Sequence, residues 1–388
     1  MFPTVTITPR GEARLRSGHP WIYRSDVRSV DANGGDTVRV VGVREKLGFA
    51  LYSDRSEIAL RLFTRGPDVP GLETWRARIQ AAIAYRDALR IYPERATAYR
   101  LIHGEADRLP GLVVDRYGEY LVLQTLAQAA DRLLPDLTQL LVEAMGPRGI
   151  LARNDPRVRL LEGLDQRVAV VHGEVPPAVE VSEGGITYDV DPYHGQKTGL
   201  FLDQRENRAA AAQYARGRAL DAFSYNGGFA LTIASHCTSV LAVDISEDAV
   251  ARITRNAARN NIKNIEARAM NVFDELRELE RRGERFDTIV LDPPAFAKNK
   301  ASVRKALSGY KEINLRALKI LSPGGYLLTC SCSYNVGEAA FADVIASAAI
   351  DADADVVVVE KRMQGRDHPV LMTVPETYYL KCFIVRKL

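Results

Sequence analysis

From about residue 180 onward, short apolar runs alternate regularly with segments that have the spacing of amphipathic helices. This alternation is typical of a mostly parallel sheet joined by crossover helices, because such a sheet is covered on both faces. The sequence therefore predicts a doubly wound α/β domain over residues 181–388. The expected strands span 219–222, 240–243, 265–270, 288–291, 325–328, 356–359 and 378–385, and the expected helices include 247–260 and 305–321.

The last expected strand follows Val374-Pro375-Glu376 and leaves no room for a crossover helix before it. A strand without a crossover joins its neighbour antiparallel. We therefore expect a seven-stranded sheet that is mostly parallel, with its last strand antiparallel at or near an edge.

The first 180 residues have a different pattern, and 388 residues exceed what a single core usually fills. Residues 1–70 contain short β-like runs at 4–7, 37–43 and 57–63, which predict a small β module. Residues 71–180 contain helical runs at 72–91 and 131–145 and a hairpin pattern at 111–126, with Gly118 in the turn. The chain is thus predicted to have three domains: 1–70, an α+β middle domain at 71–180, and 181–388.

Two adjacent glycines, Gly227 and Gly228, follow the first strand of the C-terminal domain. They allow a tight turn and close approach of a ligand to the backbone. The pattern Gly-x-Gly-x-x-Gly is absent, which disfavours a dinucleotide. Asp244 closes the second strand, where a carboxylate can accept both hydroxyls of a ribose or serve only as a helix N-terminal charge. Between ligand contact and structural support, the role of Asp221 stays open.

Asp292-Pro293-Pro294-Ala295-Phe296 follows the fourth strand. The two prolines make a rigid exit against which a planar base can lie, while Asp292 accepts a hydrogen bond from an exocyclic amine or ring nitrogen. The alternative is that the prolines merely end the strand.

Two thiols, Cys330 and Cys332, come at the end of the fifth expected strand, where such a fold places its ligand crevice. The chain has four cysteines, too few for a disulfide scaffold, and no Cys-x-x-Cys pair. We expect four free thiols and no metal site. Cys237, Cys330 and Cys382 are interpreted as small buried residues.

These motifs, in this order on consecutive strand ends, resemble class I S-adenosylmethionine-dependent methyltransferases, whose catalytic domain is Rossmann-like. Gly18-His19-Pro20-Trp21-Ile22-Tyr23 resembles part of a PUA domain, and the stretches 153–164 and 195–205 resemble the middle domain and the entry to the catalytic domain. The whole chain is similar to the RlmI-like family of bacterial rRNA large-subunit methyltransferases that form 5-methylcytosine.

The resemblance implies S-adenosyl-L-methionine as cofactor, S-adenosyl-L-homocysteine as product, and Cys332 as the nucleophile, with Asp292 beside it. Cys330 aligns with a variable position. The implied cofactor-binding residues are Asp221, Phe223, Ser224, Tyr225, Asn226, Gly227, Gly228, Asp244, Ile245, Asn271, Val272 and Asp292. Two departures stand out: Ala295 lies where related enzymes of the eukaryotic type have a second cysteine, and Asn271 lies where many class I enzymes have an acid.

A thiolate that adds to C6 of a cytosine makes C5 nucleophilic enough to take the methyl group. A free thiol is only about 3% ionised at pH 7, so a nearby cation is needed, and Lys197 and Lys298 are the candidates. The residues expected to contact the RNA or the target base are Arg14, His19, Trp21, Arg24, Lys197, Pro293, Pro294, Phe296 and Lys298. Basic residues beside aromatics suit phosphates and bases, but a solvated basic surface around a buried Trp21 fits equally.

The net charge of +3 permits a polyanionic partner without requiring one. The N-terminal residues have no targeting pattern and no apolar run reaches membrane-spanning length, so we expect a cytoplasmic protein with no membrane partner. Whether the chain is a monomer or a homodimer stays open. Three other functions compete: an N-methyltransferase acting on an exocyclic amine of an rRNA base, a non-enzymatic RNA-binding assembly factor and, least favoured, a nicotinamide dehydrogenase.

Overall fold

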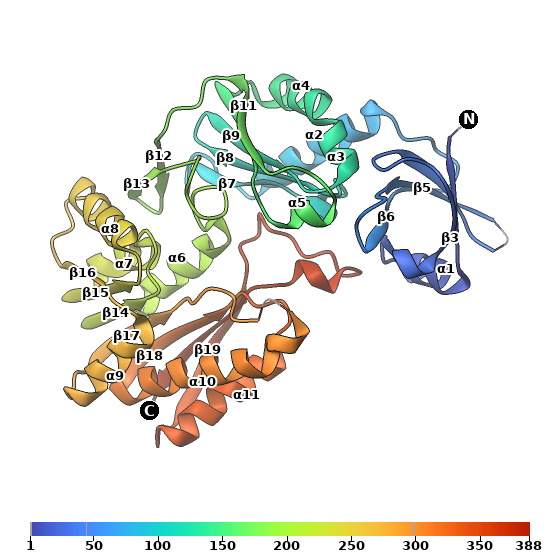
Figure 1. Cartoon of the computed structure of the whole chain (residues 1–388). Coiled ribbons are helices and arrows are strands. Elements are labelled where there is room, and N and C mark those ends of the chain that lie inside the picture. The colour runs from blue at the N-terminus through green and yellow to red at the C-terminus, as the bar shows by residue number, and fades with distance from the viewer. Residues whose placement is uncertain (1, 44, 298) are drawn as a thin grey trace. The chain divides into compact units, whose positions relative to one another are not determined.

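The computed structural model describes residues 2–43, 45–297 and 299–388, which fall into two compact units (Figure 1). The first unit comprises Met1–Val181, Asp189–Leu202 and Arg366–Thr377, and the second comprises Ser182–Tyr188, Asp203–Gly365 and Tyr378–Leu388. The segments 189–202 and 366–377, which the predicted C-terminal domain includes, are thus grouped with the first unit. The division into three domains remains a prediction.

The N-terminal part of the first unit is a six-stranded sheet in the order β2-β6-β5-β4-β1-β3. All neighbours pair antiparallel except β1 and β4. Thr8 caps the helix α1, since its side chain accepts a hydrogen bond from Gly11 N. The predicted β module is present, and its elements are β1 (Thr4–Ile7), α1 (Pro9–Arg16), β2 (Trp21–Tyr23), β3 (Val27–Asp31), β4 (Thr37–Val41), β5 (Lys46–Tyr52) and β6 (Ile58–Arg65).

A five-stranded sheet in the order β11-β10-β9-β8-β7 follows in the first unit. The predicted helix over 72–91 ends early because Arg90 adopts a left-handed conformation, and the one over 131–145 is split near Pro135. The elements are α2 (Leu72–Ala88), β7 (Ala98–His103), β8 (Leu112–Tyr117), β9 (Tyr120–Thr125), α3 (Gln128–Arg132), α4 (Leu134–Met145), β10 (Gly149–Asn154), α5 (Val158–Leu161) and β11 (Arg167–Gly173). A two-stranded sheet of β12 (Val179–Glu183) and β13 (Ile186–Val190) follows in the chain.

The second unit is built on a seven-stranded sheet in the order β16-β15-β14-β17-β18-β20-β19. The strands from β16 to β18 are mutually parallel, and β20 pairs antiparallel with both β18 and β19, one place from the edge, as predicted. Its elements are α6 (Arg205–Tyr214), β14 (Arg218–Ala222), α7 (Gly228–Ile233), β15 (Ser239–Asp244), α8 (Glu247–Arg259), β16 (Ile265–Ala269), α9 (Val272–Arg281), β17 (Phe286–Leu291), α10 (Val303–Ile320), β18 (Leu321–Ser331), α11 (Glu338–Asp351), β19 (Val356–Met363) and β20 (Lys381–Lys387).

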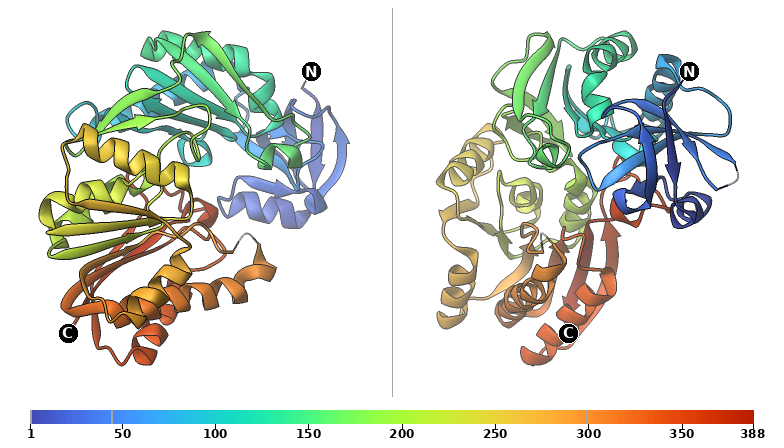
Figure 2. Two further views of the ribbon diagram at one scale, coloured as in Figure 1. Left: turned by 60° about the vertical axis from the view of Figure 1, so that its left-hand side comes forward. Right: turned by 45° about the vertical axis from the view of Figure 1, so that its right-hand side comes forward.

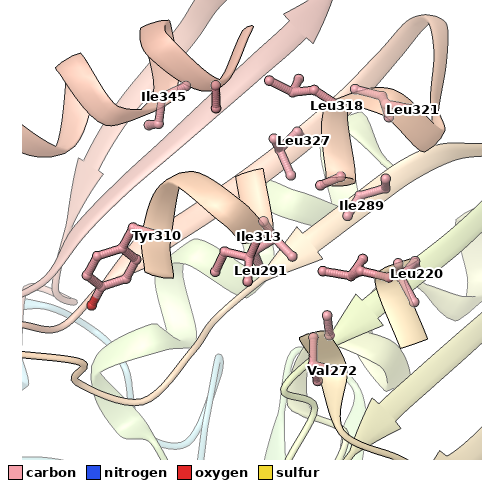
Figure 3. Close-up of a cluster of buried hydrophobic side chains, with 14 of the residues drawn as sticks. Leu220, Val272, Ile289, Leu291, Tyr310, Ile313, Leu318, Leu321, Leu327 and Ile345 are labelled. Carbon is pink, nitrogen blue, oxygen red and sulfur yellow. The ribbon is translucent and has the colours of Figure 1, made fainter. Parts of the chain in front are cut away.

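Helices cover both faces of this sheet, as Figures 1 and 2 show for the second unit. On one face, Leu220 and Leu291 pack with apolar residues of α9, α10 and α11, and Figure 3 shows part of this cluster. On the other face, Ala219 and Val290 pack with residues of α6, α7 and α8. Successive strand residues thus point to opposite buried layers, which explains the continuous apolar runs in the sequence.

Candidate active site

The carboxyl ends of four neighbouring parallel strands bring the predicted chemical groups to one edge of the sheet. Asp244 is the last residue of β15, and Asp292 directly follows β17. Asp221 is the penultimate residue of β14 and Cys332 directly follows β18. In the ladder Ala222 pairs with Leu291, and Leu291 pairs with Thr329, so these strand ends are level with one another. Ligands of doubly wound sheets bind at such an edge.

The turn after β14 has an unusual backbone. Phe223, Tyr225 and Gly227 all have positive φ angles, of 66°, 52° and 84°. The turn is tied to the neighbouring strand, because Tyr225 N donates to Asp244 Oδ2 at 2.9 Å and Ser224 N donates to the Val243 carbonyl at 3.0 Å. Positive φ at residues other than glycine is costly and occurs where the surrounding structure enforces it, often at ligand sites.

Asp221 lies buried beneath this turn. Its Oδ2 accepts a hydrogen bond from Ala230 N at 2.9 Å, whereas Oδ1 has no hydrogen-bond partner within the described residues. The pKa of Asp221 is raised to about 7, chiefly by burial and also by the negative charges of Asp292 and Asp244, while hydrogen bonds act in the opposite direction. A buried carboxyl oxygen without a donor is ready to accept one from a ligand, preferably a cation.

Asp244 holds two backbone groups, since Oδ1 accepts from Ser246 N at 3.0 Å and Oδ2 from Tyr225 N. Its carboxylate is half-buried, so lone pairs remain for ligand hydroxyls. The next residue, Ile245, has a 71% exposed side chain at the mouth of this edge, where it can cover a flat apolar ring. The contacts of Asp244 and Ile245 with a nucleoside remain predictions.

The other predicted cofactor residues lie in less direct positions. Asn271 caps α9, because its side chain accepts a hydrogen bond from Phe273 N at 2.9 Å. Val272 is buried in the apolar cluster that also contains Leu276 and Leu279, and its contact with the cofactor remains a prediction. Asn226 is buried too, and its carbonyl accepts from Asn256 Nδ2 at 3.3 Å.

Gly228 begins α7 against a buried ion pair. A Cβ at this position would lie 3.2 Å from the side chain of Arg208, whose guanidinium binds Glu183 at 2.6 Å. Close packing behind the turn therefore favours glycine here, and the role of Gly228 in ligand access remains a prediction.

An aromatic group extends from the turn after β14 to the segment after β17. Ring centroids lie 6.4 Å apart for Phe223 and Phe296, 5.9 Å apart for Phe273 and Phe296, and 4.7 Å apart for Phe296 and Tyr310. Pro293 is buried beside it, and Pro294 is exposed. Phe273 and Tyr310 were not predicted as site residues, because each lies on a helix where an aromatic residue is usually part of the core.

Asp292 is oriented by a residue that the sequence analysis missed. Gln204 Nε2 donates to Asp292 Oδ1 at 2.8 Å, and Asn207 Nδ2 in turn donates to Gln204 Oε1 at 2.6 Å. The amide pair fixes the direction of the Asp292 carboxylate. Only the spacing of Gln204 and Asn207, one turn apart at the start of α6, could have indicated this in advance.

The two thiols at the end of β18 differ sharply in environment. The strand continues to Ser331, beyond the predicted end at residue 328, so Cys330 lies within it and is fully buried opposite Cys382. Burial, followed by Cys382 and Asp292, raises the pKa of Cys330 well above its usual value. Cys332 lies just beyond the strand, is half-buried, and has its Sγ 3.7 Å from the Pro293 carbonyl oxygen.

The segment around Cys332 is held by Ser333 and by a buried lysine. Ser333 Oγ accepts from Ala297 N at 3.0 Å and shares a hydrogen bond of 2.9 Å with the Tyr310 hydroxyl. Lys381 Nζ donates to the Ser333 carbonyl at 2.7 Å. Of the two lysines expected beside Cys332, Lys298 lies outside the described residues, and Lys197 belongs to the first unit, where its Nζ lies 4.4 Å from the ring centroid of Phe201.

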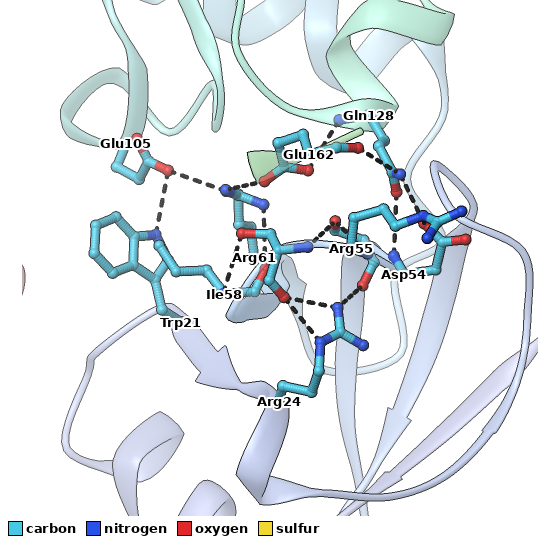
Figure 4. Close-up of polar contacts among 11 residues, drawn as sticks. Trp21, Arg24, Asp54, Arg55, Ile58, Arg61, Glu105, Gln128 and Glu162 are labelled. Atoms are coloured by element: carbon cyan, nitrogen blue, oxygen red, sulfur yellow. Dashed lines mark hydrogen bonds and ion pairs between the residues drawn. The ribbon is translucent and has the colours of Figure 1, made fainter. Parts of the chain in front are cut away.

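The predicted RNA-binding residues near the N-terminus make many contacts within the first unit. Arg14 lies on α1 and Trp21 on β2. Trp21 Nε1 donates to Glu105 at 3.2 Å, and the Arg24 guanidinium donates to the carbonyls of Ser53 and Ser56 (Figure 4).

The other two predicted RNA-binding residues of this part, Arg14 and His19, also make contacts within the first unit. Arg14 lies 4.4 Å over the ring of Tyr23, and His19 stacks edge-on against Trp21 and lies 3.7 Å from Glu376. The pKa of His19 is lowered, first by burial and also by Arg14, although Glu376 opposes this. These side chains therefore stabilise the first unit, whatever else they bind.

Within the described residues, no group of three or more His, Cys, Asp or Glu side chains could hold a metal ion, and no helix is both long and apolar enough to cross a membrane. The four cysteines are free thiols. Cys237 follows a short 3₁₀ turn at the amino end of β15, away from the edge described above.

Comparison with known proteins gives the family. A model of the S-adenosylmethionine-dependent methyltransferases matches residues 127–373, well over half of the chain. The chain belongs to this family. A second model, of PUA-like domains, matches residues 5–65, which contain the six-stranded sheet. S-Adenosylmethionine is thus the cofactor of this methyltransferase, and the predicted N-terminal PUA-like domain is confirmed.

Relatives along the whole chain narrow the family. The protein is 40% identical over 396 aligned residues to ribosomal RNA large subunit methyltransferase I of Tolumonas auensis, and 38% identical over 398 to that of Vibrio cholerae; all of both chains is covered in each case. The methyltransferase therefore belongs with the ribosomal RNA large subunit methyltransferase I proteins. The crystal structure of SMU.776, in complex with S-adenosylhomocysteine, has a TM-score of 0.86 at 21% identity over all of both chains and supports the fold.

The residues at this edge fit S-adenosylmethionine. Three carboxyl groups, Asp221, Asp244 and Asp292, interact electrostatically, and the deepest has a raised pKa. The cofactor carries a sulfonium and an ammonium group, so its positive charge offsets their repulsion. The buried, unpartnered Asp221 Oδ1 suits the ammonium, and the half-buried Asp244 suits the ribose.

Proposed function

We propose that the protein methylates carbon 5 of a cytosine in large-subunit ribosomal RNA, with Cys332 as the covalent nucleophile. The observation that carries the proposal is the placement of this thiol. Of the four cysteines, Cys330 and Cys382 are fully buried and Cys237 lies at the amino end of β15. Cys332 alone among them is both partly accessible and at the carboxyl edge of the sheet beside Asp292-Pro293.

The chemistry explains why a thiol is wanted there. Carbon 5 of cytosine is a poor nucleophile until a thiolate adds to C6 and places an electron pair at C5. When bound, S-adenosylmethionine supplies the electrophilic methyl group. Cys332 forms the bond to C6, and after methylation and loss of the C5 proton it leaves with its electron pair, which restores the ring.

Asp292 and the prolines position the base. The carboxylate, held by Gln204, can accept a hydrogen bond from the cytosine amine or from a protonated N3. Ser333 joins the segment after β17 to the segment after β18 through Ala297 N, a contact that helps to hold Asp292 and Cys332 in place. Holding the two reacting partners in one geometry is a large part of the rate gain in such reactions.

Ribosomal RNA as the substrate is supported by the names of the full-length relatives and by the PUA-like domain. Enzymes that act on a base take it out of the stack, so we expect a single-stranded or flipped cytosine. Because the net charge is only +3, we expect few phosphate contacts and a modest fall in RNA affinity with salt.

The test compares Cys332→Ala with Cys330→Ala, two equal changes two residues apart. We expect Cys332→Ala to lose methylation of ribosomal RNA while it still binds S-adenosylmethionine by calorimetry, and Cys330→Ala to keep most of its activity. RNA containing 5-fluorocytosine has no removable C5 proton, so it should leave a covalent adduct with the wild type that survives denaturing electrophoresis.

Retained turnover by Cys332→Ala would contradict the covalent mechanism. Because transfer to an exocyclic amine needs no thiol, the N-methylating alternative would then be favoured, and analysis of the methylated nucleoside would identify it. Failure of the wild type to bind S-adenosylmethionine would instead favour a non-enzymatic RNA-binding factor.

A further inference from the structure

We propose that Lys381 is the cation that stabilises the thiolate of Cys332, and that it acts as a positioning residue for the segment that carries this thiol. The inference rests on the proposed role of Cys332 as nucleophile. Lys381 is the first residue of β20 and pairs with Ser331, the residue before Cys332. The insertion of β20 between β18 and β19 thus brings a lysine from the C-terminal end of the chain to the nucleophile.

The side chain of Lys381 is only 2% exposed, which is unusual for lysine. Its Nζ donates to two carbonyl oxygens, those of Ser333 at 2.7 Å and Tyr379 at 2.9 Å. An ammonium has three N–H donors and two of them bind these carbonyls, so the third remains for an anion. Two neutral carbonyls do not balance a buried charge, whereas a thiolate does.

The pKa of Lys381 reflects the same arrangement. Burial lowers it to about 8, while the negative charges of Cys332 and Glu338 act in the opposite direction. The lysine therefore stays mostly protonated at pH 7, since its pKa still lies above that pH. The attraction is mutual, so the ammonium must favour the thiolate form of Cys332.

Other charged groups near Lys381 and Cys332 either are paired elsewhere or disfavour ionisation of the Cys332 thiol. Glu338, at the start of α11, accepts from the Tyr378 hydroxyl at 2.8 Å and pairs with Lys361 at 3.3 Å, so it competes only in part for Lys381. On the other side, the negative charge of Asp292 opposes ionisation of a nearby thiol. Tyr310 of α10 bonds Ser333 Oγ next to Cys332, and its pKa is raised first by burial and also by the negative charge of Cys332.

The experiment measures the ionisation of Cys332 itself in the full-length chain. Iodoacetamide reacts with thiolates, so the alkylation rate at Cys332 is measured by mass spectrometry of its peptide from pH 5.5 to 9.5. The midpoint of this profile is the pH at which half of the Cys332 thiol is ionised. For the wild type we expect a midpoint clearly below the value of about 8.5 for a free thiol. For Lys381→Met we expect the midpoint to rise by at least about one unit, with a roughly tenfold lower rate at pH 7, and Lys381→Arg should restore most of it.

The chain offers a matched control on the same strand. Lys387 Nζ also donates to two carbonyls, those of Leu318 and Leu321, and burial lowers its pKa, but it lies at the other end of β20. Lys387→Met should leave the Cys332 midpoint unchanged. An equal shift in both variants would show a general loss of structure and overturn the proposal.

The outcome is separable from that of the proposed function. An unchanged midpoint in Lys381→Met would refute the role of the lysine while Cys332→Ala could still be inactive. If Lys381→Met does not fold, the wild-type profile decides, since a midpoint at or above about 8.5 would leave no stabilised thiolate to explain. Conversely, if the wild type has a lowered midpoint but Cys332→Ala is still active, the ion pair between Lys381 and Cys332 is supported and the covalent mechanism is rejected.

Discussion

Replacing Asp221 by Asn should stabilise the cofactor-free protein at alkaline pH while it weakens cofactor binding. The carboxyl of Asp221 is 1% exposed, its Oδ1 has no hydrogen-bond partner within the described residues, and burial raises its pKa to about 7. An unfolded aspartate titrates near pH 4. Between these values the folded protein holds a proton that the unfolded chain has lost, so the free energy of unfolding falls as the pH rises.

The size of the effect follows from the shift. Each pKa unit is worth about 1.4 kcal/mol, so between pH 5 and pH 8 the wild type loses about 3 kcal/mol through this group. The loss levels off above pH 8, where the carboxyl is ionised in the folded protein too. Asn has no proton to lose. The amide oxygen of Asn can still accept the hydrogen bond that Ala230 N donates to Asp221 Oδ2 in the wild type. The difference in unfolding free energy between Asp221→Asn and the wild type should therefore grow by about 3 kcal/mol between pH 5 and pH 8.

Urea denaturation followed by circular dichroism at pH 5 and pH 8, without cofactor, measures this difference. Asp343→Asn is the matched control, because the same chemical change on an exposed position of α11 should have a small and pH-independent effect. Calorimetry should show a large loss of S-adenosylmethionine affinity for Asp221→Asn alone. The same Asp221→Asn difference at both pH values would refute the reasoning, because it would mean that Asp221 is ionised normally.

Two further predictions concern the first unit and the cofactor turn. Glu162→Gln breaks the buried ion pair with Arg61, 2.7 Å long and shown in Figure 4, and should cost about 3–5 kcal/mol. Both tryptophans, Trp21 and Trp75, belong to the first unit, so their fluorescence in urea follows the unfolding of this unit. As a control, Glu119→Gln removes an exposed pair with Arg148 and should lower the free energy of unfolding by less than about 1 kcal/mol. Gly227→Ala introduces a Cβ at a φ of 84°, should cost about 1–2 kcal/mol, and should lower cofactor affinity in calorimetry. Gly283→Ala has a similar φ of 67° in open space and should leave that affinity unchanged.

The order and type of the elements in the second unit could be predicted from the sequence because they depend on local periodicity. Each predicted strand overlaps an observed one, and the predicted helix at 247–260 is present as α8, which Ser246 caps through Ala249 N. The strand ends then place Asp244, Asp292 and Cys332 at one edge without knowledge of side-chain contacts. Strand lengths were less predictable: β18 runs three residues further than its apolar pattern, because Thr329, Cys330 and Ser331 also pair with β20.

Contacts between distant segments were not predictable in this way. Gln204 and Lys381 reach Asp292 and the Cys332 segment only through tertiary packing. The stretch 195–205 resembles the family's entry to the catalytic domain, but it does not tell which of its residues contacts Asp292. For the aromatic and basic residues near the N-terminus, the sequence indicated a binding site but not their contacts inside the protein. Their composition suits RNA, yet Trp21 and Arg24 already bond within the first unit, a distinction that only coordinates provide.

The different environments of Cys330 and Cys332 follow from where β18 ends. A residue inside a central strand is enclosed by neighbouring strands and helices, so the thiol of Cys330 meets Cys382 and the negative charge of Asp292, and both its burial and these neighbours disfavour the thiolate. One residue past Ser331 the backbone leaves the sheet, and the thiol of Cys332 gains partial access and a buried ammonium on the adjacent strand. Since a thiolate is both the nucleophile and the leaving group in the proposed reaction, the end of β18 together with the ammonium of Lys381 would favour Cys332 over Cys330 for this role.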